Sequence, residues 1–306
     1  MKTIAFFSNV SGAGTTSLVY HVAWMFADQG LPVLAVDLDP QGDLTAMLLG
    51  QDRRAELGLL NMAHGVILPA TRGEIAVPPL EKISETLGVL PCDLDLGAFE
   101  DVLAEAFQQS DKASLERITT IDRLIKDKAG DWAKLVLIDL GPNLGALNRA
   151  ALTAADHIIL PVAPTIPFRQ GWRTLGPMLS KWRNRWERIP KEPTTPLGLM
   201  KPAGYIVMQS GRPGGGKTIP LAYRQDVLSE VGNAAPGVNI EGDPNCLGQL
   251  KHYVGMLHLA LEAHKPMFHL TPVDGAIGAY VEAVRDCKSE YLALARRIAA
   301  VAGISL

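Results

Sequence analysis

The chain has 306 residues, a formal net charge of −3 and a pI near 6.2, and 47% of its residues are hydrophobic while 20% are charged. This composition is typical of a soluble globular protein and argues against a chain that coats nucleic acid along its whole surface. No stretch approaches the roughly 18 apolar residues of a membrane span, and the apolar run at the N-terminus is too short for a secretory signal, so we expect a cytoplasmic protein.

Short apolar segments alternate along the chain with segments of helical periodicity. Helices are predicted over 15–29 and 276–303. Strands are predicted over 2–8, 32–39, 87–92, 133–141, 157–164 and 203–210. Strands that are apolar at nearly every position are buried on both faces. The expected fold is therefore α/β, a doubly wound and mostly parallel sheet with helices on both faces.

No internal repeat or low-complexity linker divides the chain, so we expect one domain over residues 1–306. The polar, helix-rich stretch at about 50–130 is interpreted as an elaboration packed on the sheet, and the Pro-rich stretch 191–202 as a surface connection. The three cysteines, at 92, 246 and 287, lack metal-site spacing and are expected to be buried thiols.

The segment SGAGTTS at 11–17 lies between the first predicted strand and the first predicted helix. Gly12 and Gly14 permit backbone conformations that aim N–H groups at an anion, and the helix from Thr15 adds its positive end. Thr16 lies at the position where phosphate-binding loops carry the hydroxyl ligand of Mg²⁺. The residues predicted to bind a nucleotide are Ser11, Gly12, Ala13, Gly14, Thr15, Thr16 and Ser17.

Acidic residues follow two of the predicted strands. Asp37 and Asp39 lie at the end of the second strand, and Asp139 lies at the end of the strand 133–141. In open parallel sheets, ligands bind at the carboxyl ends of the strands. Each acid taken alone could cap a helix or form a turn, but three of them beside a phosphate-binding loop favour a Mg–nucleotide site.

Two longer segments, VLAVDLDPQGDLT (33–45) and VLIDLGPNLGALNRAALTAADHIILPV (136–162), resemble the ParA/MinD-type P-loop ATPases with a deviant Walker A motif. Weaker agreement comes from 88–103 and 264–284, so that the resemblance covers nearly the whole chain. Members of this family position plasmids, chromosomes, division sites and other cargo. The resemblance thus implies a P-loop NTPase fold that binds ATP or ADP with Mg²⁺.

The resemblance also implies roles for single residues. Asp39 would activate or orient the attacking water as the catalytic residue, and Asp37 would support the metal-binding edge. Asp139 would hold Mg²⁺ through water, and Thr16 would ligate it directly. The strand 203–210 and the residues after it would approach the base.

The chain departs from the family in its loop, which normally reads K-G-G-x-G-K-T-T. Val10 replaces the signature lysine, which in members of the family reaches across a dimer to the nucleotide of the partner subunit. Thr15 replaces the lysine that contacts the β- and γ-phosphates. A hydrogen bond to a charged group is worth roughly 1.5–3 kcal/mol, or about 10- to 150-fold in affinity. A donor aimed at developing charge is worth about 10²–10³ in rate. We therefore expect nucleotide binding with slow or absent hydrolysis.

The segment GRPGGGKT at 211–218 also fits the G-x-x-x-x-G-K-[ST] pattern. Because no later strand ends in an acid, we interpret it as a surface or active-site loop. A sharper alternative is that Lys217 or Arg212 substitutes for a missing lysine.

The resemblance implies a homodimer with a sandwiched nucleotide, in which the PNLG segment (142–145) and the helix from about Phe168 form the dimer face. Arg169 or Arg212 could supply charge across that interface, because a guanidinium suits bidentate phosphate contact.

The stretch SKWRNRWERIPK (180–191) is basic. It is a candidate for non-specific DNA binding through phosphate contacts, but we favour an amphipathic helix whose tryptophans pack inward. The last helix is likewise expected to pack on the protein and not to target a membrane.

The function predicted is a nucleotide-dependent dimerising switch that acts on a cargo or a protein partner that the sequence does not identify. The first alternative is a pseudo-ATPase that serves as a scaffold or adaptor. The second is a slow but genuine ATPase in DNA or plasmid partition.

Overall fold

The computed structural model of the chain describes residues 1–57, 80–92, 94–163, 166–189, 198–210 and 245–306. Eight strands form one sheet in the order β3-β4-β2-β5-β1-β6-β7-β8. The strands are β1 (Lys2–Phe6), β2 (Val33–Asp37), β3 (Glu81–Lys82), β4 (Leu87–Leu90), β5 (Leu135–Asp139), β6 (His157–Val162), β7 (Lys201–Ser210) and β8 (Cys246–Lys251). Strands β3 and β4 pair antiparallel, and the other neighbours pair parallel.

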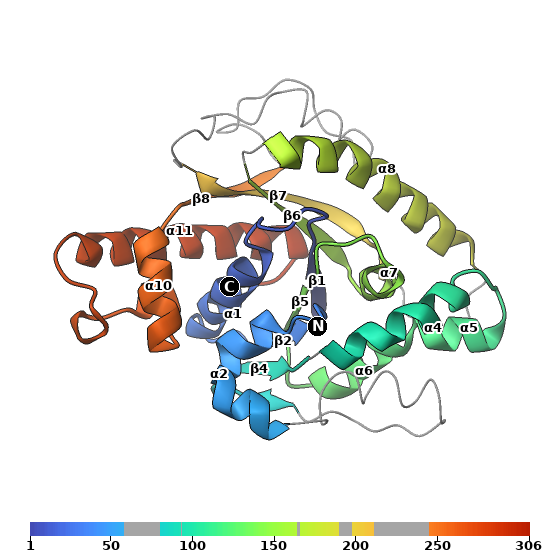
Figure 1. Ribbon diagram of the computed structural model, residues 1–306, viewed down its shortest axis with the longest axis horizontal. Coiled ribbons are helices and arrows are strands. Elements are labelled where there is room, and N and C mark those ends of the chain that lie inside the picture. Colours follow the sequence, from blue (N-terminus) through green and yellow to red (C-terminus); the bar gives the residue numbers. More distant parts are fainter. Residues whose placement is uncertain (58–79, 93, 164–165, 190–197, 211–244) are drawn as a thin grey trace.

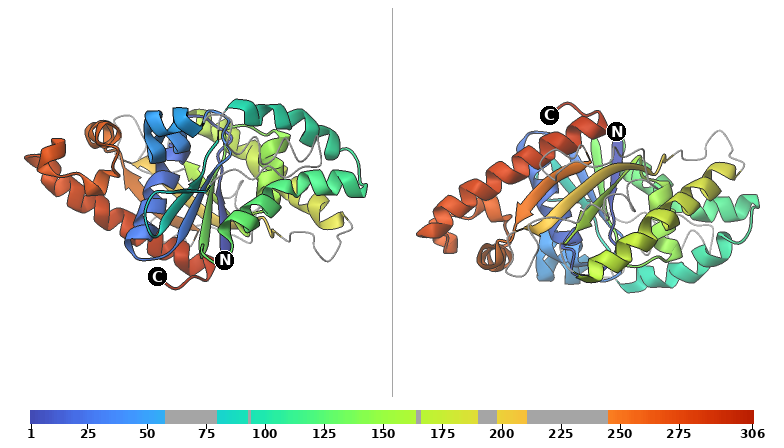
Figure 2. Two further views of the ribbon diagram at one scale, coloured as in Figure 1. Left: turned by 90° about the horizontal axis from the view of Figure 1, so that it is seen from below. Right: turned by 90° about the horizontal axis from the view of Figure 1, so that it is seen from above.

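Helices cover both faces of this sheet (Figures 1 and 2). One layer consists of α4 (Phe99–Ala106), α5 (Lys112–Ile118), α6 (Thr120–Ala129), α7 (Ala146–Thr153) and α8 (Ile166–Arg188). The opposite layer consists of α1 (Thr15–Asp28), α2 (Asp43–Leu57), α10 (Val254–Ala263) and α11 (Ala279–Ala302). Short 3-10 turns are η1 (Leu94–Ala98), η3 (Met267–His269) and η4 (Pro272–Asp274). The predicted doubly wound α/β fold is thereby confirmed.

The central strands are buried along their whole length. Every residue of β2 (VLAVD), β5 (LVLID) and β6 (HIILPV) is buried. Apolar side chains that alternate between the faces fill the two helix–sheet cores, which is the pattern of a parallel sheet covered on both sides. The same alternation places Asp37 and Asp139 as direct neighbours across the β2–β5 pair.

Other predictions from the sequence differ from the structure at their ends. The six predicted strands are present, most of them trimmed by a few residues. The Pro-rich connection predicted over 191–202 is wrong at its end, because β7 already begins at Lys201. The stretch at 50–130 contains α4, α5 and α6 as expected, and besides the predicted strand β4 it contributes β3 to the sheet edge. That all 306 residues form one domain stays a prediction.

Strand β8 and helix α10 were not predicted. The β8 sequence, CLGQLK, mixes apolar and polar residues, and its buried and exposed positions reflect an edge strand. Because β8 lacks the continuous apolar run of the central strands, the sequence pattern did not reveal it.

Several packing predictions are confirmed. The three cysteines are free and buried. Trp182 and Trp186 on α8 are buried, whereas Lys181, Arg185 and Arg188 are exposed. Helix α11 packs its second half on the sheet. In the part of the chain that the structure describes, no helix combines the length and apolarity that crossing a bilayer requires.

Candidate functional site

The loop after β1 ends at the N-terminus of α1, where residues 14–17 are partly exposed. Gly12 and Gly14 have φ of +79° and +81°, which other residues rarely adopt. Gly14 caps α1 without any side-chain hydrogen bond, and Leu18 donates to the Gly14 carbonyl at 2.9 Å. The first N–H groups of a helix have no acceptors within the helix, and no acidic side chain lies in the first turn of α1. This end of α1 is therefore suited to an anion.

The loop is held by local contacts and by β7. The Ser8 hydroxyl accepts from the Val10 N–H at 3.3 Å, and the Val10 side chain packs against the cluster of Ala13 and Ala163. The Gln209 amide donates to the carbonyl of Gly12 at 3.4 Å. Val10 thus packs the loop against the end of β6.

Asp37, the last residue of β2, is buried with both carboxylate oxygens engaged. One oxygen accepts from the Thr45 N–H at 2.8 Å and from the Thr45 hydroxyl at 2.7 Å, and the other accepts from the Asp39 N–H at 3.2 Å. Burial raises the pKa of Asp37 although these bonds oppose the rise. Thr45 also accepts from the Cys92 N–H at 2.9 Å, so this carboxylate joins β2 to α2 and to the end of β4.

Asp139, the last residue of β5, is different. Both of its oxygens are buried, and neither has a hydrogen-bond partner among the described residues. Burial first, and then the adjacent Asp37, raise the pKa of Asp139 well above its usual value, and the nearby Thr16 side chain only partly offsets this. An unpartnered buried carboxylate in a native protein points to a missing ion or ligand.

These groups fit Mg²⁺ held together with a nucleotide. Mg²⁺ keeps several waters and is bound through one or two carboxylates plus substrate phosphates. No group of three or more His, Cys, Asp or Glu side chains within the described ranges is arranged to hold a metal by itself. Thr16 and Asp139 therefore suit a metal that arrives with phosphate oxygens, and not a metal bound by protein alone.

Asp39 lies two residues beyond β2 and is about half-buried. One of its oxygens accepts from the Gln41 N–H at 3.1 Å. Burial, and more weakly the charge of Asp43, raise the pKa of Asp39. Its carboxylate lies against Gly141, where an added Cβ would come within 3.2 Å of the Asp39 oxygen. Asp39 thus faces the loop 140–145 that follows β5.

The loop 140–145 is fixed by an asparagine that the sequence analysis missed. The Asn148 side-chain amide donates to the carbonyls of Gly141 at 2.7 Å and of Asn143 at 2.9 Å. The Asn143 side chain in turn accepts from the Gly145 N–H at 2.9 Å. The sequence analysis also missed Thr45, although this residue ends the segment VLAVDLDPQGDLT (33–45).

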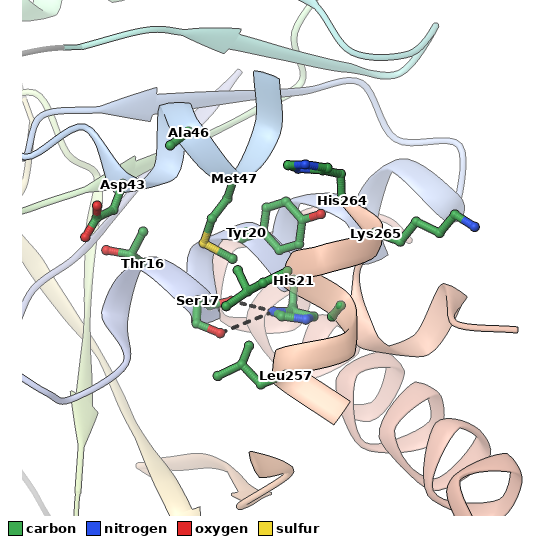
Figure 3. Close-up of a pocket in the computed structure, with 12 residues that line it drawn as sticks. Thr16, Ser17, Tyr20, His21, Asp43, Ala46, Met47, Leu257, His264 and Lys265 are labelled. Carbon is green, nitrogen blue, oxygen red and sulfur yellow. Dashed lines mark hydrogen bonds between the residues drawn. The ribbon is translucent and has the colours of Figure 1, made fainter. Parts of the chain in front are cut away.

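A cavity of about 480 Å³ lies between α1, α2 and α10, beside the loop 11–17 (Figure 3). Thr16 and Asp43 lie at one end of it, and His264 and Lys265 lie at the other. Between these ends the lining is mostly apolar and includes Tyr20, Ala46, Met47, Leu257, Ala260 and Leu261. The cavity therefore favours apolar groups, whereas anions are favoured at the loop itself.

The predicted site residues thus divide into two groups. The loop 11–17 and the three aspartates are described, and they lie at the carboxyl edge of the sheet. Arg212, Lys217 and the whole segment 211–218 lie outside the described residues, and of Arg169 only the backbone in α8 is described. The assigned roles of all these residues stay predictions.

Known proteins resemble this chain in sequence. The sequence model of the AAA domain family matches residues 1–188. A probable plasmid-partitioning protein ParA of Thermus thermophilus is 28% identical over 67% of this chain and 58% of its own length. The chromosome-partitioning ATPase Soj of the same organism is 32% identical over 53% of this chain and 55% of its own length. The chain spans about half the length of the curated relatives that it matches.

Solved structures resemble nearly the whole chain. A Corynebacterium diphtheriae protein has a TM-score of 0.69 at 19% identity and covers 98% of each chain. An ATP complex of a McdA variant from Cyanothece has a TM-score of 0.67 at 14% identity and covers 100% of this chain and 98% of its own. The septum site-determining protein MinD of Pyrococcus horikoshii with Mg-ADP has a TM-score of 0.62 at 18% identity and covers 99% and 97%. At these identities the likeness supports the fold.

The contrast between the two buried carboxylates predicts opposite effects of the same substitution. Asp139→Asn removes a buried charge without partners and should raise the melting temperature of the ligand-free protein by a few degrees, about 1–3 kcal/mol. Asp37→Asn replaces one of the two acceptor oxygens with an amide donor, so it breaks at least one of the three hydrogen bonds that Asp37 accepts and should lower the melting temperature by a similar amount. Differential scanning calorimetry at pH 7.5 without divalent cations measures both, and a lower melting temperature for Asp139→Asn would contradict this account.

Proposed function

The chain belongs to the AAA domain family, as a ParA/MinD-type P-loop ATPase, and on this basis we propose that it is a nucleotide-dependent dimerising switch. It binds Mg–ATP or Mg–ADP at the loop 11–17 and acts in the partition or positioning of DNA or another cargo. The partitioning proteins of Thermus thermophilus that this chain resembles, one for plasmids and one for chromosomes, support this general assignment.

One observation carries the proposal. The anion-binding end of α1 and the unpartnered carboxylate of Asp139 lie at the same edge of the sheet, with Thr16 on α1 close enough to act on the pKa of Asp139. A Mg–nucleotide complex satisfies both sites at once, because its phosphates accept from the loop N–H groups and its metal offsets the carboxylate charge. In this arrangement the Thr16 hydroxyl would ligate the metal, and Asp139 would hold it through water and offset its charge.

We further propose that hydrolysis is slow or absent. Val10 and Thr15 leave the loop without the two cations that stabilise the phosphates in the family, and Val10 packs against Ala13. Asp39, about half-buried beside Gly141, remains in place to orient water. Mg²⁺ would neutralise part of the phosphate charge, so nucleotide affinity should be retained to a greater extent than the rate of hydrolysis, which depends on donors aimed at the developing charge. If nucleotide does not bind, the chain is better described as a scaffold of the same fold.

Weak, saturable binding of Mg–ADP is expected for the unmodified protein by calorimetry with millimolar nucleotide. Gly12→Val should abolish it, because the loop N–H groups are displaced. Gly30→Val is a matched control, since both glycines have φ of +79° and open space where a Cβ would lie. Equal binding by the wild type and Gly12→Val would place the nucleotide elsewhere.

Restoring a cation to the loop should strengthen binding. Thr15→Lys is expected to lower the Kd for Mg–ATP by about tenfold or more, as one charged hydrogen bond predicts. Thr15→Met extends the side chain without charge and should leave the Kd near that of the wild type. Phosphate release by the unmodified protein should be far slower than in lysine-bearing relatives. Brisk release that persists in a Lys217→Ala variant would refute the proposal of slow hydrolysis.

A dimer that is stabilised by nucleotide is the expected assembly. Light scattering at about tens of micromolar protein, where weak dimers become visible, should show a higher mass with a non-hydrolysable ATP analogue and Mg²⁺ than with Mg–ADP. Gly12→Val should show no such increase. If the wild type stays monomeric in both states while calorimetry shows binding, the switch is not a dimerising one.

A further inference from the structure

Glu100 of α4 hydrogen-bonds to the start of α7, directly after the loop that faces Asp39. Glu100 lies in the first turn of α4, 46 residues before the start of α7. Its carboxylate accepts from the N–H groups of Ala146, in a short hydrogen bond, and of Leu147 at 2.8 Å. Helix α7 has no capping side chain of its own. Its positive end is therefore satisfied by a carboxylate from a distant helix.

The contact is tight enough to fix the position of the loop 140–145. A Cβ added to Gly145 would collide with the Glu100 carboxylate, and it would come within 2.9 Å of the Asn143 side-chain oxygen. Asn143 is bonded to Gly145 and, through Asn148, to Gly141. A continuous series of contacts thus runs from Glu100 to the backbone that lies against Asp39.

A second contact joins the same two helical segments. The Arg149 guanidinium on α7 lies 3.9 Å from the ring centroid of Phe107, the residue that follows α4. Arg185 on α8 donates to the carbonyl of Phe107. Helix α7 is therefore tied to α4 at its N-terminus through Glu100 and further along through Arg149 and Phe107.

From these contacts we propose that Glu100 is a positioning residue for nucleotide binding at this site. It sets the loop 140–145 against Asp39 and so makes the site respond to the γ-phosphate. This inference rests on the proposed function. If a Mg–nucleotide binds as proposed, between the loop 11–17 and Asp139, the loop 140–145 that directly follows Asp139 would border the γ-phosphate of ATP, which ADP lacks. A contact that is made in only one of these two states is what a nucleotide-dependent switch requires. A change at the γ-phosphate would then pass from the loop 140–145 through α7 to α4.

The test compares the Kd values of Mg–ADP and of Mg-bound non-hydrolysable ATP analogue in four proteins. Glu100→Ala should raise the Kd of the analogue by about five- to tenfold, a usual size for coupling between sites. The same substitution should change the Kd of Mg–ADP by less than about twofold. Glu100→Gln keeps one acceptor oxygen and should fall between the wild type and Glu100→Ala. Asp101→Asn removes one charge from the same turn at an exposed position and should match the wild type.

A double-mutant cycle separates positioning from simple helix capping. Gly145→Ala alone should raise the Kd of the analogue, because the new methyl group displaces Glu100. In a Glu100→Ala background the same substitution should have a much smaller effect. Hydrogen exchange of the Ala146 and Leu147 amides in the wild type should be slower with the analogue than with ADP.

The possible results are distinct. A lowered melting temperature with an unchanged ratio of the two Kd values would show that Glu100 is only a helix cap, and would overturn the inference while the proposed function stands. Absence of any nucleotide binding by the wild type would overturn both. If Glu100→Ala does not fold, two other measurements decide whether Glu100 acts as a positioning residue. These are the ratio of the two Kd values in Glu100→Gln and the hydrogen exchange of the Ala146 and Leu147 amides in the wild type.

Discussion

The structure depends on two buried carboxylates placed side by side at the ends of β2 and β5. Asp37 is satisfied by three hydrogen bonds from the protein, whereas Asp139 has none among the described residues. An uncompensated buried charge costs several kcal/mol, which is a large share of the stability of a domain. The arrangement is understandable if a cation neutralises Asp139 when the protein works. Thr16 and the positive end of α1 lie where that cation would arrive with a phosphate group.

The satisfied carboxylate explains how the acidic edge keeps its shape. Asp37 accepts from Thr45, and Thr45 accepts from the Cys92 N–H, so the start of α2 and the end of β4 are tied to β2. Asp39 is left on a short turn between these anchored parts, facing Gly141. Glu100 and Asn148 give the opposite side of the site a similar support. The edge is thus built from elements that are fixed before any ligand binds, which reduces the cost of ordering upon binding.

The sequence predicted the parts of this arrangement that local patterns encode. Continuous apolar runs revealed the buried strands, and the glycines and strand-end acids marked the carboxyl edge. Which acid is satisfied and which is not could not be read from the chain, because Asp37 and Asp139 differ in their contacts and not in their local pattern. Glu100 was also invisible, since its partners at 146 and 147 are close only in the folded chain. Strand β8 was missed because an edge strand does not need a continuous apolar run.

The most direct test of the central claim is a crystal structure with Mn²⁺ and a non-hydrolysable ATP analogue, in which the anomalous signal locates the metal. The account predicts one strong peak beside Thr16 and Asp139, with the phosphates on the N–H groups of residues 12–17. A metal and nucleotide bound at 211–218, or an empty acidic edge at saturating nucleotide, would contradict it.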